Sequence, residues 1–239
     1  MPQFTELWPG GPVFAQAKNQ RLGTDSVLLA DFVRTRPGRR GIDLGCASGV
    51  IALLLLAQEP SLHMTGLELE QGAAVLARAN MEANGFTGRS EIVTGDIRDH
   101  RTLFRCGSFD FVVANPPYFP LGSGALPPDP GRAAARSELA CSLDELVRAA
   151  AWLLPTGGSL FLVHRPERLS ELCVTLSACA IEPKRLRFVC PRPGSAPILV
   201  LVEGRRGGHT GLTIEAPLTL YDADGSESAE YRRIYHRAQ

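Results

Sequence analysis

The chain contains almost no lysine: of its 25 basic residues, only Lys18 and Lys184 are not arginine. Acidic residues also number 25, so the formal net charge is zero. This balance provides no general attraction to nucleic acid, because phosphate binding depends on Lys and Arg. We expect most of the basic clusters to be solvated surface and one or two to contact a polyanion. The clusters are Arg34/Arg36/Arg39/Arg40, Arg132/Arg136, Arg165/Arg168, Lys184/Arg185/Arg187, Arg205/Arg206 and Arg232/Arg233/Arg237.

Long apolar runs are also missing. The longest, residues 50–57, is too short to span a bilayer, and the N-terminus lacks the basic, apolar and small-residue pattern of a secretion signal. The sequence therefore predicts a cytoplasmic protein. The six cysteines include no C-x-x-C pair and have no histidine at ligand spacing, which predicts reduced thiols rather than disulfides or a metal site.

Strand-like and helix-like segments alternate along the chain, which predicts an α/β fold with a mostly parallel sheet and helices on both faces. The expected strands are residues 41–44, 64–67, 91–93, 109–114, 159–163, 187–190 and 198–203. The expected helices are residues 25–33, 50–58, 70–84, 143–154 and 167–179. We expect one domain over 1–239, with an N-terminal segment (1–40) that contributes to the site, a core sheet (41–203) and a C-terminal tail (204–239). In the tail, Leu218 and Leu220 should dock and the last residues should form a short helix.

A glycine-containing turn, Asp43-Leu44-Gly45-Cys46-Ala47-Ser48-Gly49, follows the first core strand and opens a helix. Gly45 and Gly49 let the backbone turn tightly and approach a ligand. The dinucleotide fingerprint G-x-G-x-x-G is not met, because position 47 is Ala. Asp43 instead places a carboxylate at the mouth of the sheet, where a positively charged ligand would suit it better than a pyrophosphate.

Two further acidic residues end the next strands. Glu68 can accept hydrogen bonds from two ribose hydroxyls, as an acidic residue does in dinucleotide folds; the alternative is a surface carboxylate near a helix start. Asp96 can accept a hydrogen bond from an adenine amino group; the alternative is a loop carboxylate that faces solvent. Together with Asp43, these residues predict a nucleoside site.

Asn115-Pro116-Pro117-Tyr118 closes the strand expected at residues 109–114. Two prolines stop the strand in a stiff extended turn, and their flanking carbonyls are acceptors. The Asn115 side-chain oxygen and the Pro116 carbonyl can bind a planar NH2 group while Tyr118 stacks on a base. A simple strand-ending turn is the alternative.

The segment 119–136 is rich in proline and glycine, which predicts a loop with a function or without order. Arg132 and Arg136 lie in it and are candidates for phosphate contacts. Among the histidines, only His164 ends an expected strand, and a structural or exposed histidine is the favoured interpretation.

Asp43, Gly45, Ser48, Gly49, Glu68, Asp96 and the N-P-P-Y motif occur in an order that resembles the class I S-adenosylmethionine-dependent methyltransferases. The likeness spans about residues 23–203, and N-P-P-Y is similar to the motif of enzymes that methylate an exocyclic or amide nitrogen. The resemblance implies a doubly wound, Rossmann-like sheet of seven strands and S-adenosyl-L-methionine as cofactor. It gives Asn115 a part in both cofactor binding and catalysis.

A narrower resemblance links the chain to the tRNA(Val) adenine-N6 methyltransferase family and its Gram-positive relatives. This resemblance rests on the segment 20–29 with Gly23-Thr24-Asp25, the segments 135–138, 163–169 and 182–186, and the tail around 217–224. Thr24 thereby joins the expected cofactor residues. Ser137 departs from the histidine of many relatives, and Cys46-Ala47 replaces the commoner pair of a small residue and Gly.

The resemblance implies methyl transfer to an exocyclic nitrogen of an RNA base, with adenine N6 in a tRNA anticodon loop as the favoured acceptor. Pro117, Tyr118, Arg132 and Arg136 would contact this substrate. Alternatives are an rRNA base, a glutamine amide of release factors, and a scaffold that binds the cofactor without turnover. Glutamine methyltransferases carry a helical substrate domain before the glycine turn, and only 42 residues precede Asp43 here, which favours RNA.

Overall fold

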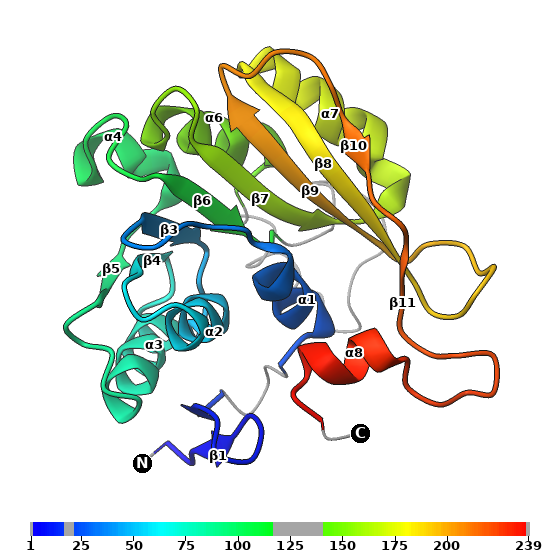
Figure 1. The fold of residues 1–239 in the computed structure, drawn as a ribbon. Helices are drawn as coiled ribbons and strands as arrows, with labels where there is room; N and C mark the ends of the chain where they lie inside the picture. The colour runs from blue at the N-terminus through cyan, green and yellow to red at the C-terminus, as the bar shows by residue number, and fades with distance from the viewer. Residues whose placement is uncertain (1, 17–21, 117–140, 238–239) are drawn as a thin grey trace, which may run out of the picture.

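A computed structural model describes residues 2–16, 22–116 and 141–237 of the chain. Its central element is one sheet with the strand order β10-β8-β9-β7-β6-β3-β4-β5, to which β11 adds alongside β8 (Figure 1). Five neighbouring strands are parallel: β7 (Ser159–His164), β6 (Phe111–Ala114), β3 (Arg40–Leu44), β4 (His63–Glu68) and β5 (Ser90–Thr94). The antiparallel β9 (Leu199–Arg206) joins them to β8 (Ile181–Cys190). The mostly parallel α/β fold predicted from the sequence is therefore confirmed.

Helices cover both faces of the sheet because alternate strand residues point in opposite directions. Val113 and Phe161 pack into the layer of α1 (Thr24–Phe32) and α2 (Val50–Gln58), and Met81 of α3 (Gln71–Ala83) joins them. Val112 and Leu160 pack against α6 (Leu143–Leu153) and α7 (Leu169–Ala178) on the other face. The strands are thus apolar on both sides, as buried parallel strands are.

The C-terminal segment returns to the first layer. Strands β10 (Thr213–Ile214) and β11 (Leu218–Thr219) run along β8, and α8 (Ala229–Ile234) packs near α1 (Figure 1). Leu218 and Leu220 are buried in the core shared with α1 and α2. The predicted docking of these leucines and the terminal helix are both confirmed.

Several boundaries differ from the prediction. The sheet gains the two-residue β10 and β11 beyond the seven expected strands, and β8 begins six residues early, at Ile181. Pro183 is tolerated there because a register shift lies between Pro183 and Arg185 and β10 pairs only from Arg185 onward. A single helix over 167–179 is wrong at its start, where η2 (Pro166–Arg168) precedes α7.

Short elements were also missed, because two to four residues carry little periodicity. They are η1 (Ile97–Asp99), α4 (His100–Leu103) and a hairpin of β1 (Thr5–Glu6) with β2 (Val13–Phe14).

None of the helices in the described ranges has the length and apolar composition that a bilayer crossing requires.

The N-terminal hairpin is attached to α3 by two asparagines one turn apart. Asn80 Oδ1 accepts from the Ala15 amide at 2.8 Å, and its Nδ2 donates to the Ala15 carbonyl at 2.9 Å. Asn84 makes the same pair of bonds with Val13 at 2.8 and 2.7 Å. Each asparagine side chain thus hydrogen-bonds both the N–H and the C=O of one residue, as a neighbouring strand would. Asn80 also contacts Ser48, so the N-terminal segment lies beside the glycine turn.

Candidate functional site

The carboxyl ends of β6, β3, β4 and β5 lie side by side, because these four strands are adjacent and parallel. Asp43 on β3 stands in register with Gly66 of β4 and Val113 of β6. Neighbouring strands are about 4.8 Å apart, so the side chains that end them share one edge. The structure therefore brings together the predicted residues Asn115, Asp43, Glu68 and Asp96 in that order.

The glycine turn folds over the end of β4. The Gly45 and Cys46 amides both donate to the Leu67 carbonyl, at 2.8 and 3.1 Å. Gly45 and Gly49 have φ values of +75° and +80°, the left-handed region that glycine enters without strain. Among the described residues, no atom outside its chain neighbours lies within 4 Å of the position that a Gly45 Cβ would take, which leaves the backbone there open to a ligand.

Ala47 also adopts a left-handed conformation, with φ of 48°. Its amide donates to Glu68 Oε2 at 2.8 Å, which fixes the turn against the end of β4. The dinucleotide fingerprint has glycine at position 47. Ala47 adopts the backbone conformation that suits glycine, and its methyl group makes that conformation sterically unfavourable.

Asp43 is a buried carboxyl group at the carboxyl ends of these strands. The side chain is 1% exposed, and neither carboxylate oxygen has a hydrogen-bond partner among the described residues. Burial, and next the negative charge of Glu68, raise the pKa of Asp43 from 3.8 to about 8. A buried carboxylate without a partner is costly, and a cation placed at this edge would remove that cost.

Glu68 and Asp96 are already engaged in local hydrogen bonds. Glu68 Oε1 accepts from the Glu70 amide at 2.8 Å, in addition to the bond from Ala47. Each carboxylate oxygen has two acceptor sites, so both can still accept a ribose hydroxyl. Asp96 accepts from the Arg98 amide and guanidinium, whose hydrogen bonds lower the pKa of the Asp96 carboxyl. Any ligand amino group would therefore share Asp96 with Arg98.

Asn115 directly follows β6. Its Nδ2 donates to the Ser26 hydroxyl, on the first turn of α1, at 3.0 Å. Pro116 is buried behind it. The other expected substrate residues, Pro117, Tyr118, Arg132 and Arg136, lie outside the described residues.

Two more of the expected cofactor residues lie near the N-terminal segment. Ser48 is buried, and its backbone carbonyl accepts from Asn80 Nδ2 at 2.8 Å. Thr24 is the first residue of α1 and is half-buried. Sequence reasoning missed Ser26 and Asn80. Ser26 lies within the segment 20–29 on which the narrower resemblance rests, so that resemblance could have pointed to Ser26.

His164, at the end of β7, is buried and Nδ1 accepts from the Arg165 amide at 2.8 Å. Burial and the nearby Arg168 lower the pKa of its imidazole. A neutral histidine held by backbone agrees with the structural interpretation preferred from the sequence.

Comparison with known proteins gives consistent results. A family model for the methyltransferase small domain matches residues 8–125. The chain is 34% identical over 224 residues to a tRNA1(Val) (adenine(37)-N6)-methyltransferase of Porphyromonas gingivalis, with 90% of this chain and 86% of the relative covered. It is 30% identical over 220 residues to the protein of the same name from Tolumonas auensis, with 88% and 86% covered.

The fold has solved counterparts as well. A crystal structure of an Agrobacterium tumefaciens protein, described as a predicted O-methyltransferase, superposes with a TM-score of 0.74 at 23% identity. It covers 90% of this chain and 97% of its own. This likeness shows the methyltransferase fold and carries no information about the acceptor atom.

Proposed function

Because this chain belongs to the family of tRNA1(Val) (adenine(37)-N6)-methyltransferases and is an N-methyltransferase, we propose that it methylates N6 of adenine in the anticodon loop of a tRNA. The methyl donor in this proposal is S-adenosyl-L-methionine, and a tRNA substrate would place the reaction in the cytoplasm. One observation carries the proposal. Asn115, an acceptor for an NH2 group, directly follows the strand next to that of Asp43, a buried carboxyl that a cation would stabilise in its ionised form.

The residues of the edge fit this cofactor. Its methionine moiety carries positive charge, which Asp43, whose carboxylate has no partner within residues 2–16, 22–116 and 141–237, would balance. The open backbone at Gly45 leaves room for a close approach, and Glu68 retains acceptor sites for ribose hydroxyls. Asp96 would accept from the adenine amino group of the cofactor. The cofactor supplies an electrophilic methyl group on a sulfonium.

The protein's task is then to hold an amine lone pair in line with that methyl group, since positioning supplies much of the rate. The amino nitrogen of adenine is a weak nucleophile because its lone pair is delocalised into the ring. Hydrogen bonds from its two N–H groups to Asn115 Oδ1 and the Pro116 carbonyl would favour a tetrahedral nitrogen and stabilise the positive charge that develops there. Tyr118 would stack on the base after it leaves the anticodon stack, and Arg132 and Arg136 would contact phosphates.

The acceptor can be identified directly. We expect the protein, incubated with cofactor labelled in the methyl group, to label unmodified tRNA and to leave rRNA and release factors unlabelled. Nuclease digestion and mass spectrometry should then find N6-methyladenosine. Label in rRNA or on a release-factor glutamine would replace the proposed acceptor, and the absence of label from all three would leave a binding scaffold.

The role of Asn115 is tested by its replacement. Asn115→Ala should reduce methyl transfer by at least about 100-fold, because it removes a hydrogen bond that strengthens as charge develops. Cofactor binding, measured by calorimetry, should persist. Near-normal turnover in this variant would contradict the proposed mechanism.

A further inference from the structure

The Asn115 side chain is held by a residue from the N-terminal segment, 89 positions earlier. Its Nδ2 donates to Ser26 Oγ at 3.0 Å, and both residues are partly buried. A carboxamide is planar, with its nitrogen and oxygen on opposite arms. Since the nitrogen arm is directed at α1, the Oδ1 arm is directed away from that helix. A carboxamide without such a partner could turn by 180° about its last bond and exchange the two arms, because that torsion is broad and two-fold.

Helix α1, which carries Ser26 near its N-terminal end, packs against the C-terminal segment. Tyr235 packs against the core cluster that includes Val27 and Leu28 of α1, and Tyr231 contacts the Tyr235 ring with 4.8 Å between centroids. Burial raises the pKa of the Tyr235 phenol above its usual value.

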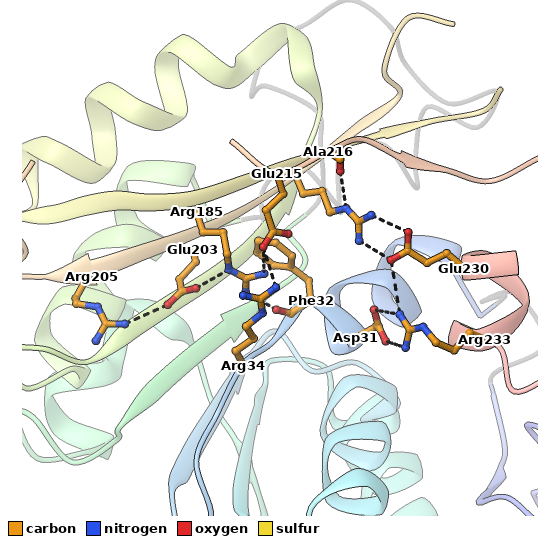
Figure 2. Close-up of polar contacts among 11 residues, drawn as sticks. Asp31, Phe32, Arg34, Arg185, Glu203, Arg205, Glu215, Ala216, Glu230 and Arg233 are labelled. Atoms are coloured by element: carbon orange, nitrogen blue, oxygen red, sulfur yellow. Dashed lines mark hydrogen bonds and ion pairs between the residues drawn. The ribbon is translucent and has the colours of Figure 1, made fainter. Parts of the chain in front are cut away.

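The opposite end of α1 is fixed by two arginines (Figure 2). Arg233 of α8 forms a forked pair with Asp31 at 2.9 and 3.1 Å. Arg185 of β8 donates to the Phe32 carbonyl at 2.6 Å, and its guanidinium lies 3.7 Å from the centre of the Phe32 ring. A cation at the last carbonyls of a helix is favourable because unpaired C=O groups gather there. These contacts hold α1, the helix that carries Ser26, against β8 and α8.

We propose that Ser26 is a positioning residue that holds the Asn115 side chain in place, with Nδ2 toward α1 and Oδ1 toward the acceptor amine. This inference rests on the proposed function and adds a residue to it. The reverse orientation would present two N–H donors to the donor groups of the acceptor amine, which cannot hydrogen-bond to them. The bond from Nδ2 to the Ser26 hydroxyl holds the side chain in the productive arrangement.

The test compares three variants under saturating cofactor and varied tRNA. In Ser26→Ala the amide loses its hydrogen bond to the Ser26 hydroxyl, and we expect kcat to fall about tenfold, the effect of one hydrogen bond. The KM for tRNA and the calorimetric Kd for cofactor should change less than about twofold. Ser26→Thr keeps the hydroxyl and should keep kcat within about threefold of the parent. Ser170→Ala removes an exposed serine from α7 and should have no effect.

The outcomes separate this inference from the proposed function. If the parent methylates tRNA adenine and Ser26→Ala keeps full kcat, the positioning role is wrong and the proposed function stands. A rise in cofactor Kd with unchanged kcat would likewise overturn it, because Ser26 would then serve the cofactor. Loss of kcat in both Ser26→Ala and Ser26→Thr, with thermal melting of both unchanged, would show that the hydroxyl is not the operative group. If the parent itself leaves tRNA adenine unmethylated, the proposed function fails first.

Discussion

Replacement of Asp43 by asparagine should separate stability from cofactor binding. The native protein holds the Asp43 proton up to about pH 8, whereas an Asp in the unfolded chain loses it near pH 3.8. Between these values the native state binds one more proton than the unfolded state. The stability of the wild type should therefore decrease by about 1.4 kcal/mol per pH unit from this group alone as pH rises through that window.

Asp43→Asn has no such proton to lose. Its free energy of unfolding, relative to that of the wild type, should rise by about 2.7 kcal/mol between pH 5 and pH 7, the product of the single-proton slope and two pH units. Urea unfolding of both proteins without cofactor at pH 5, 6 and 7 gives this difference. Glu91→Gln, which neutralises an exposed carboxyl on β5, is the control and should follow the wild type. Parallel stability curves for Asp43→Asn and the wild type would refute the assigned burial cost.

The same variant should lose the cofactor. A cation beside Asp43 would keep its carboxylate ionised, so binding to the wild type below pH 8 should release a proton. Calorimetry at pH 7 in two buffers of different ionisation enthalpy would measure that release. We expect Asp43→Asn to bind at least about tenfold more weakly and with less proton release. Unchanged affinity and proton release in Asp43→Asn would refute the role of Asp43.

Two further predictions concern stability. Ala47→Gly relieves a left-handed alanine that costs about 1 kcal/mol, partly offset by the greater freedom of glycine in the unfolded chain, and should raise the urea midpoint slightly. The matched change Ala57→Gly, on the exposed side of α2, should lower stability by about 1 kcal/mol, and equal effects of the two would contradict the strain at Ala47. Arg185→Ala leaves the buried Glu203 without its 2.9 Å partner and should cost about 3–5 kcal/mol in urea unfolding. Arg205→Ala removes an exposed partner of the same carboxylate and should cost less than about 1 kcal/mol; similar losses would show that burial does not decide the effect.

The environments of the clustered arginines could not be predicted from neighbouring residues alone. The sequence favoured solvated surface for each cluster, which is wrong for Arg185, a buried residue that contacts Glu203 and the end of α1. Arg187 pairs with Glu230. Arg233 pairs with Asp31 (Figure 2). Each partner is distant in sequence or on another element, so charge spacing along the chain could not identify it.

The glycine turn shows the opposite case. Gly45, Gly49 and the carboxylates before and after the turn were predicted to lie at the end of strands, and the structure places them there. Strand period, loop composition and the rule that parallel strands end at one edge are all local or topological, so a sequence contains them. Gly66 belongs to the same arrangement, since a side chain there would meet Cys46 Sγ 2.7 Å away.

The sequence by itself determined the alternating elements, the α/β class and the carboxylates and asparagine that face a common edge, because periodicity and strand ends are written in neighbouring residues. Only the tertiary structure decided how those groups are held and charged. Three features join residues from different elements: the burial that raises the pKa of Asp43, the asparagines that attach the N-terminal hairpin, and the bond between Ser26 of α1 and Asn115. Such contacts exist only once the chain has packed, so no local pattern specifies them.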